Sequence, residues 1–333
     1  EKAGLIANRG GAGGVVLSGH TDVVPADGQP WGRDPFRLTR EGARLFGRGT
    51  TDMKGFVACA LALAEQPAEA QGPVSIVLSW DEEVGCRGIP HMIPHLEAAL
   101  GPQALCVVGE PTSLVMATGH KGKAALNALC TGQAGHSALA PQYVNALHMA
   151  ADLVVELRAV QSYLADNGAN DTAYDVPYST LHVGKMAGGR ALNIVPDHAE
   201  LTLEYRHLAA DVPRDMMQRI MDAASNVEAR YQPAFAGARV RITQTNAYPG
   251  LDVAATSPAA ILSKRLLQNN QTTKVAFGTE AGFFDAMGIS TIVCGPGSMA
   301  GQGHQPDEFV TLDQLTACDA MLAGVVADLC SQG

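Results

Sequence analysis

Three short and uninterrupted apolar runs constrain the fold of this chain most strongly. They cover residues 14–20, 74–80 and 104–109, and aliphatic side chains dominate each of them. Runs of this length that are apolar on successive residues are typical of strands covered on both faces of a sheet. The Ala-rich segment 53–66 and the segment 86–100 favour helices between these strands. The alternation predicts an α/β domain whose sheet is mixed and largely parallel.

The middle of the chain follows a different pattern. Its expected elements, in chain order, are a strand at 121–132, a helix at 144–165, strands at 179–189 and 198–208, a helix at 213–231 and a strand at 238–245. This order is that of a ferredoxin-like α+β unit. The α/β pattern then resumes, with helices at 257–268 and 311–330 and a strand at 290–295. We therefore expect one domain made of residues 1–119 and 246–333, with a second domain, residues 120–245, inserted into it.

Composition excludes several classes of protein. Of the 333 residues, 47% are hydrophobic and 17% charged, which is typical of a globular chain rather than a disordered one. A net charge of -10 argues against binding to a nucleic-acid backbone. No apolar stretch approaches the roughly 20 residues that cross a bilayer, and no signal peptide is recognisable. Seven cysteines without a C-x-x-C pair indicate buried, reduced thiols of a cytoplasmic protein. Because the sequence begins with Glu1, we expect an N-terminal segment to be missing.

Histidines and carboxylates gather where the predicted strands end. The set comprises His20, Asp22, Asp52, Glu82, Glu83, Glu110 and His304. Taken singly, each has an ordinary structural alternative: a turn residue after a strand, an N-cap in the case of Asp52, or a loop residue. In open α/β sheets, however, functional groups collect at the carboxyl ends of the strands. Since all seven are residue types found in zinc sites, together they predict a two-metal hydrolase.

The sharpest local signal is the acidic triplet that follows the second apolar run. Asp81, Glu82 and Glu83 are consecutive, and carboxylates this close repel one another unless cations offset their charge. An acidic surface turn is the alternative. In the middle segment, His136 of GHSA is far from this set in sequence. It would polarise a carbonyl, hold an oxyanion or simply cap the helix that follows.

These motifs resemble those of one enzyme family. The segments are SGHTDVVP, GRGTTDMKG, DEEVG, GEPT, GHSA, NIVPD and GHQPDE. In this order, and across essentially the whole chain, they are similar to the M20 family of metallopeptidases and deacylases. The stretches GEPTSLVMATGHKG, FGTEAGFF and GPGSMAGQGHQPDEF are similar to the acetylornithine deacetylase branch. The resemblance implies a zinc-peptidase-like catalytic domain and an inserted lid and dimerisation domain.

The resemblance also implies a role for each site residue. The metal ligands would be His20, Asp52, Glu83, Glu110 and His304, with Asp52 bridging two divalent ions, Zn²⁺ or Co²⁺. Glu82 would be the general base, Asp22 would orient the site, and a cis peptide would follow Asp52. His136 would stabilise the oxyanion in a partner subunit. The substrate would contact Asn193, Arg206, Thr279 and Glu280, the last facing the cationic end of the substrate.

The expected activity is hydrolysis of the amide bond of an N-acyl amino acid. The first candidate is N-acetyl-L-ornithine, giving L-ornithine and acetate in arginine biosynthesis, by a cytoplasmic homodimer joined through the lid. A sibling desuccinylase, aminoacylase or dipeptidase would use the same metal site. A non-catalytic binding protein or a purely structural dimer on the same scaffold are the alternatives outside catalysis.

Overall fold

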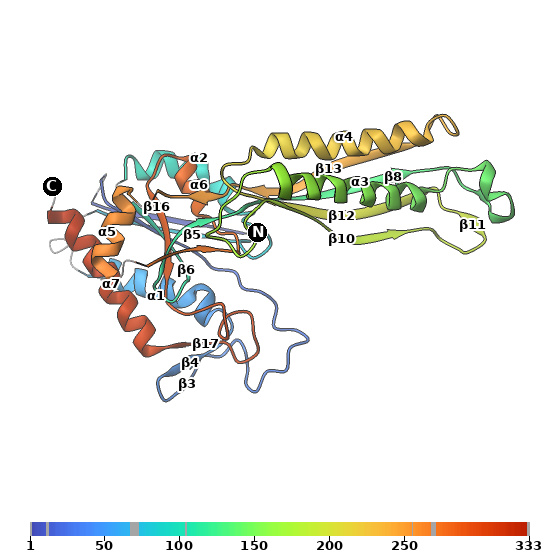
Figure 1. Cartoon of the computed structure of the whole chain (residues 1–333). Coiled ribbons are helices and arrows are strands. Elements are labelled where there is room, and N and C mark those ends of the chain that lie inside the picture. The colour runs from blue at the N-terminus through green and yellow to red at the C-terminus, as the bar shows by residue number, and fades with distance from the viewer. Residues whose placement is uncertain are drawn as a thin grey trace. The chain divides into compact units, whose positions relative to one another are not determined.

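A computed structural model describes residues 2–10, 13–66, 73–103, 105–254, 256–267 and 271–331. The chain forms two compact units, which we call unit 1 (Glu1–His120 with Leu251–Gly333) and unit 2 (Lys121–Gly250). Figure 1 shows their elements. Two segments that are distant in sequence thus make unit 1, and one continuous segment makes unit 2.

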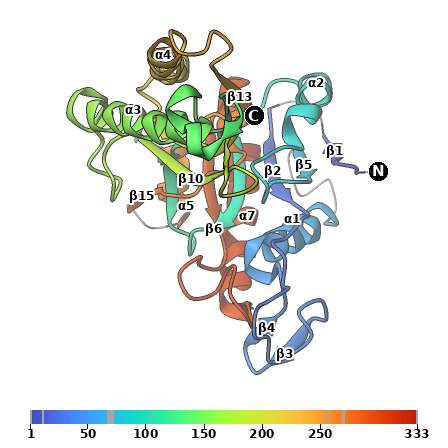
Figure 2. The same ribbon diagram turned by 90° about the vertical axis from the view of Figure 1, so that its right-hand side faces the viewer.

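Unit 1 is built on an eight-stranded sheet of order β1-β5-β2-β6-β16-β7-β14, with β15 also paired to β7. The strands are β1 (Leu5–Arg9), β2 (Val15–His20), β5 (Val74–Ser79), β6 (Leu105–Pro111), β7 (Met116–His120), β14 (Leu251–Asp252), β15 (Thr272–Val275) and β16 (Thr291–Gly295). Strands β5, β2, β6 and β16 run parallel, whereas β1 and β14 pair antiparallel with their neighbours. Figure 2 shows β1, β5, β2 and β6 side by side. The predicted mixed and largely parallel sheet is confirmed.

Helices cover both faces of this sheet. One face packs against α1 (Gly55–Ala64), α5 (Pro258–Leu267) and α7 (Leu312–Ser331), and the other against α2 (Ile89–Leu100) and α6 (Ala281–Ala286). Every residue of β2 and β6 is buried, as expected for strands covered on both sides. The apolar runs that predicted these strands therefore form the core of unit 1.

A small second sheet in unit 1 holds two distant loops together. It has the order β17-β4-β3 and consists of β3 (Thr39–Glu41), β4 (Arg44–Phe46) and β17 (Phe309–Thr311). The chain leaves β4 into a π-helical turn, Thr50–Lys54, before α1 begins at Gly55. The peptide bond between Asp52 and Met53 is cis, as the family resemblance implies. The predicted helix thus starts two residues later than expected, after this turn.

Unit 2 is a four-stranded antiparallel sheet with two helices. Its main elements are β8 (Gly122–Thr131), α3 (Ala146–Asn167), β10 (Thr180–Gly188), β12 (His198–His207), α4 (Pro213–Tyr231) and β13 (Arg239–Tyr248). The sheet order β10-β12-β8-β13 is that of the predicted ferredoxin-like arrangement. Short elements complete the unit: β9 (Gly135–His136), the 3-10 helix Ser137–Gln142 and β11 (Ile194–Val195).

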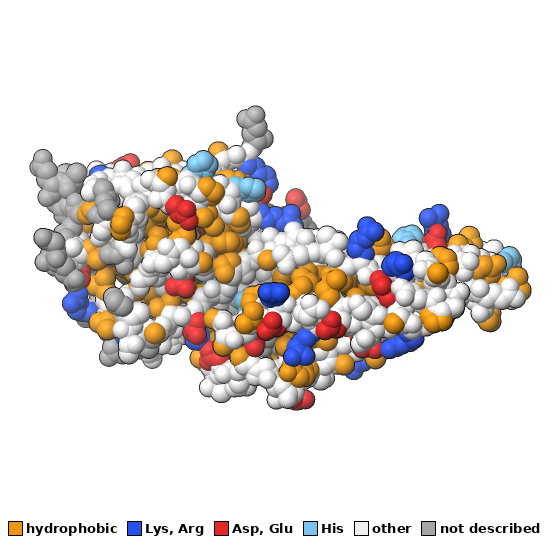
Figure 3. Space-filling model, turned by 90° about the horizontal axis from the view of Figure 1, so that it is seen from above, with side chains coloured by type: hydrophobic (Ala, Val, Ile, Leu, Met, Phe, Trp, Pro, Cys, Tyr) orange, Lys and Arg blue, Asp and Glu red, His pale blue; other side chains and the backbone are white. Residues whose placement is uncertain are grey.

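The core of unit 2 lies between the sheet and the two helices. Both α3 and α4 pack on the same face, so alternate residues of β8 and β12 are buried beneath them. Figure 3 shows side chains of both charge signs among apolar ones along the outer surface of these helices. There Arg230 pairs with Asp152 and Glu156 of α3.

Six cysteine side chains, Cys59, Cys86, Cys106, Cys130, Cys294 and Cys318, are free and buried, as the sequence predicts for them. The side chain of the seventh, Cys330, is outside the described part of the chain. None of the helices in the described segments has the length and apolarity needed to span a membrane.

Candidate metal centre

The predicted metal ligands come together at one end of the unit 1 sheet. His20 is the last residue of β2, Glu110 is the penultimate residue of β6, and Glu83 follows β5. Asp52 lies in the π-helical turn and His304 in the loop before β17. Since parallel strands end at the same edge of a sheet, the strand topology alone brings three of these five side chains together. The other two ligands lie next to the small sheet of β3, β4 and β17, since Asp52 follows β4 and His304 precedes β17.

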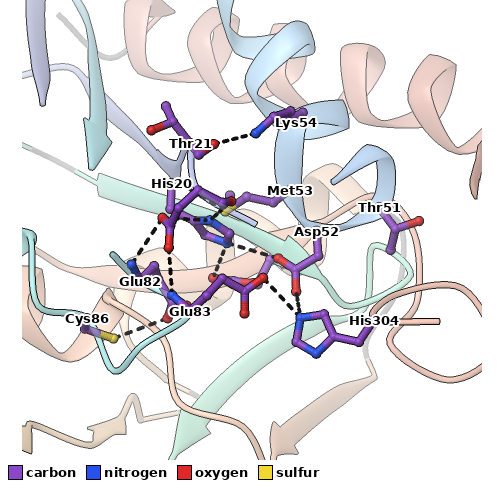
Figure 4. Close-up of polar contacts among 12 residues, drawn as sticks. His20, Thr21, Thr51, Asp52, Met53, Lys54, Glu82, Glu83, Cys86 and His304 are labelled. Atoms are coloured by element: carbon purple, nitrogen blue, oxygen red, sulfur yellow. Dashed lines mark hydrogen bonds and ion pairs between the residues drawn. The ribbon is translucent and has the colours of Figure 1, made fainter. Parts of the chain in front are cut away.

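Asp52 occupies the centre of this cluster. Its Oδ1 lies 3.0 Å from Nε2 of His20 and its Oδ2 lies 3.1 Å from Nε2 of His304. Figure 4 shows the two rings approaching the carboxylate from different sides. The N-cap alternative for Asp52 is wrong, because α1 is preceded by Lys54 and has no side-chain cap. Each carboxylate oxygen serves a different histidine, which is the geometry a bridging ligand requires.

Two groups of closely spaced donor atoms share His20, and one of them contains Asp52. Donor atoms of His20, Asp52 and Glu83 lie within 4.8 Å of one another, and so do those of His20, Glu82 and Glu110. Oε1 of Glu83 is 3.1 Å from Nε2 of His304, and Oε1 of Glu110 is 3.9 Å from Nε2 of His20. Imidazole nitrogens combined with carboxylate oxygens at this spacing suit zinc or cobalt.

The electrostatics of the cluster favour a bound cation. Burial and the neighbouring charges of Asp52 and Glu82 raise the pKa of Glu110 well above its usual range. Hydrogen bonds to Asp52 and Glu83 raise the pKa of His304 to about 10. In the described segments, the ion-pair partners of these buried carboxylates are histidines, with no Lys or Arg among them. A divalent ion would supply the positive charge that so many close carboxylates need, so the residues present fit a metal centre.

Asp22, two residues after β2, links this strand to the acidic loop. Its two carboxylate oxygens accept hydrogen bonds from the backbone N–H groups of Glu82 and Glu83, at 3.2 and 3.1 Å. Its backbone oxygen lies 3.0 Å from Nδ1 of His20, and its Oδ1 lies 3.5 Å from the same nitrogen. A partner on Nδ1 determines the tautomer and ring orientation of a histidine that binds metal through Nε2. Asp22 therefore contacts three groups of the site, the His20 ring and the backbone N–H groups of Glu82 and Glu83.

Glu82 has the most unusual environment of the acidic triplet. Burial, with the nearby charges of Asp52 and Glu83, raises the pKa of Glu82 to about 7 despite the opposing effect of His20. Its Oε1 accepts a hydrogen bond from the thiol of Cys86 at 3.2 Å. Burial and the charge of Glu82 raise the pKa of Cys86, so this thiol keeps its proton and remains a donor. A carboxylate with a pKa close to neutrality can both accept and return a proton.

Several loop residues of the site have left-handed backbone conformations. Asp81, Cys86 and His304 have φ values of 56°, 54° and 58°, although none is a glycine. Non-glycine residues in this region cost of order 1–3 kcal/mol each and concentrate at functional sites. Sequence patterns do not reveal these conformations, because all three residues also occur in ordinary loops.

Thr279 and Glu280 lie in unit 1 at the start of α6 and are both buried. The Thr279 hydroxyl accepts a hydrogen bond from the backbone N–H of Ala281 at 3.0 Å. Glu280 is only 1% exposed, and its Oε1 has no hydrogen-bond partner in the described chain. Burial, followed by the charge of Glu82, raises the pKa of Glu280 to about 8. A carboxylate oxygen that is buried this deeply and has no hydrogen-bond partner needs a positively charged or hydrogen-donating group beside it.

The other three predicted site residues belong to unit 2. Nδ1 of His136 accepts a hydrogen bond from the backbone N–H of Ala138 at 3.1 Å, so His136 caps the 3-10 helix Ser137–Gln142, as one of the alternatives expected. The backbone oxygen of the exposed Asn193 accepts a hydrogen bond from the N–H of Ser137, which places it beside this cap. Arg206 is the penultimate residue of β12 and pairs with Glu204, at 2.9 Å from Nε to Oε1. The structure thus brings His136 and Asn193 together and leaves Arg206 apart.

Two buried charged residues beside the cluster are absent from the predicted set. Arg48 and Glu308 form an ion pair of 2.7 Å, and Glu308 also contacts the backbone of Asp52. Both lie within quoted motifs, GRGTTDMKG and GHQPDE, yet they are 260 positions apart. Nothing in the sequence indicates that they meet.

Comparison with known proteins identifies the family. The model of peptidase family M20/M25/M40 matches residues 16–328. An acetylornithine deacetylase from Myxococcus xanthus is 33% identical over 334 residues, 99% of this chain and 85% of the relative. Another, from Aliivibrio salmonicida, is 34% identical and covers 93% of this chain and 80% of the relative.

Solved structures show the same fold. An M20 family metallo-carboxypeptidase from Sulfolobus solfataricus superimposes with a TM-score of 0.76 at 17% identity, over 97% of this chain and 87% of that one. A tripeptidase from Staphylococcus aureus gives 0.74 at 17% identity, over 99% and 85%. At this identity the likeness concerns the fold, while the family match and the deacetylase relatives concern the sequence itself. The chain therefore belongs to peptidase family M20/M25/M40.

Proposed function

We propose that this protein is a metal-dependent hydrolase that cleaves the amide bond of N-acetyl-L-ornithine and releases L-ornithine and acetate. The observation that carries the proposal is the Asp52 carboxylate, which presents one oxygen to each of two histidines. Donor atoms of Glu83 lie within 4.8 Å of those of Asp52 and His20, and donor atoms of Glu110 lie within 4.8 Å of those of His20. The relatives named acetylornithine deacetylase, about one-third identical over nearly the whole chain, support the choice of substrate.

We assign the metal ligands to two groups that share Asp52. His20 and Glu110 would complete one position, and Glu83 and His304 the other. The assignment is supported by the short distances from Asp52 to His20 and from His304 to both Asp52 and Glu83. Zinc is the proposed metal, with cobalt as a substitute, because both accept nitrogen and oxygen ligands in this arrangement.

The two ions, when bound, would lower the pKa of a water molecule toward neutrality and polarise the substrate carbonyl. Glu82 is the proposed general base, which takes a proton from the attacking water and returns it to the departing amine. Its raised pKa and its hydrogen bond from Cys86 support this role. Asp22 keeps the Glu82 backbone in place through its own hydrogen bond to the N–H of that residue.

Glu280 is the residue we assign to the cationic end of the ornithine side chain. Its buried Oε1 has no hydrogen-bond partner in the described structure, and Thr279 orders the backbone beside it. An ammonium group next to this oxygen would make the ionised form of Glu280 favourable. A neutral acyl amino acid would leave the carboxylate unpaired, so Glu280 would discriminate between the two substrates.

The roles proposed for unit 2 rest on the family resemblance. Unit 2 would be the lid and would join two copies of the chain, and His136 would stabilise the oxyanion in the partner subunit. Asn193 and Arg206 would hold the substrate carboxylate or the oxyanion. A homodimer of the cytoplasm, acting in arginine biosynthesis, is the corresponding proposal for the whole protein.

The test is a substrate comparison on metal-stripped protein reloaded with Zn²⁺ or Co²⁺. We expect activity to return with metal, and kcat/KM to be highest for N-acetyl-L-ornithine among three substrates, the others being N-succinyl-diaminopimelate and N-acetyl-L-methionine. In Glu280→Gln, kcat/KM should fall for acetyl-ornithine and change little for acetyl-methionine. Highest activity on another substrate would identify a sibling enzyme. Metal binding without hydrolysis of any substrate would indicate a binding protein.

A further inference from the structure

A buried polar network connects the backbones of Asp52 and His304. At its centre is the ion pair between Arg48 and Glu308, whose side chains are 1% and 0% exposed. Arg48 follows β4 and Glu308 precedes β17, so the pair links the loop after β4 to the loop before β17. A buried ion pair is only weakly stabilising by itself, because both charges must be desolvated. The partners of each group indicate what this pair does.

Glu308 uses both of its carboxylate oxygens. Oε1 accepts hydrogen bonds from the backbone N–H groups of Thr51 and Asp52, at 2.9 and 3.1 Å. Oε2 accepts from Nη1 of Arg48 at 2.7 Å. The two peptide groups that precede the Asp52 side chain are thus held by a single oxygen, and this sets the direction in which that side chain points.

Arg48 extends the network to the second loop. Its Nη2 donates to Oε1 of Gln29, and Nε2 of Gln29 donates to the backbone oxygen of His304 at 3.0 Å. Trp31 completes the enclosure, since its Nε1 donates to the same Gln29 oxygen at 3.1 Å and its ring lies 4.9 Å from the guanidinium carbon. One end of the network therefore holds the backbone of Asp52, and the other holds that of His304.

We infer that Glu308, Arg48 and Gln29 are positioning residues that set the spacing between Asp52 and His304, and through it the affinity for the metal pair. The inference rests on the metal ligands proposed above. None of the three touches the proposed donor atoms. They act on the two backbones, whose side chains lie 3.1 Å apart between Oδ2 of Asp52 and Nε2 of His304. Groups that orient metal ligands in this way typically change metal affinity or activity by about 10–100-fold when removed.

Glu308→Gln is the most direct perturbation. The amide would have one acceptor oxygen where the carboxylate has two, and its NH₂ group cannot accept from a donor. It could serve either the two backbone N–H groups or Arg48, but not both. Gln29→Leu breaks the connection between Arg48 and the backbone of His304, together with the hydrogen bond from Trp31, and leaves the ion pair between Arg48 and Glu308 intact.

The experiment measures zinc affinity and stoichiometry by competition with a chromogenic chelator, on metal-stripped protein well below its unfolding temperature. We expect Glu308→Gln to bind both ions about 10–100-fold more weakly, because Asp52 would be shared by both positions. Gln29→Leu should lower the affinity for one zinc ion and leave the affinity for the other unchanged. Asp307→Asn is the matched control, since Asp307 lies in the same loop and pairs with Arg33 but does not contact Asp52.

The outcomes separate this inference from the proposed function. Parental protein that binds no zinc would overturn the proposed metal centre and this inference with it. Parental protein that binds two ions while Glu308→Gln binds both with unchanged affinity would overturn the inference alone. If Glu308→Gln does not fold, the double variant Arg48→Met/Glu308→Gln removes both buried charges. Weakened zinc binding in the folded double variant supports the inference, and parental affinity overturns it.

Discussion

Asp52 determines the geometry of the candidate centre, because each of its oxygens faces a different histidine. Burial acts to raise the pKa of Asp52, but the contacts with His20 and His304 outweigh it and keep that pKa below its usual range. Asp52 is therefore ionised and available to cations on both sides. The residues around it are of two kinds. The proposed metal ligands face the centre, whereas Asp22 accepts hydrogen bonds from the backbone N–H groups of Glu82 and Glu83.

Glu82 should be required for turnover and dispensable for metal binding. Substituting Glu82→Gln removes the group that accepts a proton while preserving its size, so kcat should fall by about 10²–10⁴-fold. Elemental analysis should still find two metal ions per chain. Glu97→Gln, on the exposed surface of α2, is the control and should retain parental kcat. Near-parental turnover by Glu82→Gln would show that another group is the base.

Glu280 should make the metal-free protein less stable as pH rises. Its folded-state pKa of about 8 lies above the ordinary value of 4.5, so between these limits the unfolded chain has lost a proton that the folded chain keeps. The favourable contribution is complete below pH 4.5 and is lost as pH rises through 8, amounting to roughly 3–5 kcal/mol.

Denaturant unfolding in the presence of a chelator, at pH 5 and at pH 8, measures this effect. The free energy of unfolding should fall less steeply with pH in Glu280→Gln than in the parental protein, since Gln does not ionise. Glu82 and Glu110 also have raised pKa values, so both proteins should lose stability as pH rises and only the steepness should differ. Parallel pH dependences for the two proteins would contradict the assignment to Glu280.

At the scale of elements, the position of the ligands depends on close packing between α1 and β6. The ring of Phe56 in α1 lies directly over Gly109, the residue before Glu110. A Cβ at position 109 would lie 1.9 Å from Cγ of that ring. Only glycine allows the helix to approach the strand this closely. The strand end that carries Glu110 and the turn that carries Asp52 are thereby held together.

Gly109→Ala should destabilise the protein by about 1–3 kcal/mol, because the added methyl group forces the Phe56 ring or the strand to shift. Denaturant unfolding monitored by circular dichroism measures the change. Gly184→Ala in β10 is the control, since its Cβ would meet only ordinary contacts, the nearest at 3.5 Å. Equal stability of the two variants would show that the core accommodates the methyl group.

Elements with an apolar pattern of their own could be predicted from the sequence, and elements created by tertiary packing could not. Strands β2, β5 and β6 are short runs rich in aliphatic residues and were predicted. Strand β7 reads Met-Ala-Thr-Gly-His, which has little strand propensity, yet it is fully buried between β16 and its other neighbours. The three-residue strands β3, β4 and β17 are too short to show a periodicity.

The same distinction applies to the candidate site. His20, Glu83 and Glu110 could be predicted to meet because parallel strands end at one edge of a sheet. The contact between Arg48 and Glu308 could not, since their loops meet through a small sheet that no periodicity reveals. The roles of His136, Asn193 and Arg206 stay predictions from the family resemblance.

At the scale of the whole molecule, the residues that the structure describes form two separate hydrophobic cores. One lies between α1, α7 and the large sheet of unit 1, and the other between α3, α4 and the sheet of unit 2. All five proposed metal ligands belong to unit 1. Metal binding should therefore stabilise the core of unit 1 directly.

Calorimetric unfolding with and without zinc tests this expectation. Zinc at 100 times its Kd should stabilise unit 1 by about 2.7 kcal/mol and raise its transition temperature. The transition of unit 2 should change much less, so a chelator should separate the two transitions. A single transition that shifts as a whole with zinc would mean that the two units unfold together.

The most direct test of the account is the number of zinc ions bound per chain, measured by calorimetric titration of the metal-stripped protein and of Asp52→Asn. The account predicts two ions for the parental chain. It predicts fewer than one tightly bound ion for the variant, because an amide cannot offer an anionic oxygen to both positions. One ion or none in the parental protein, or two in the variant, would contradict a centre built on Asp52.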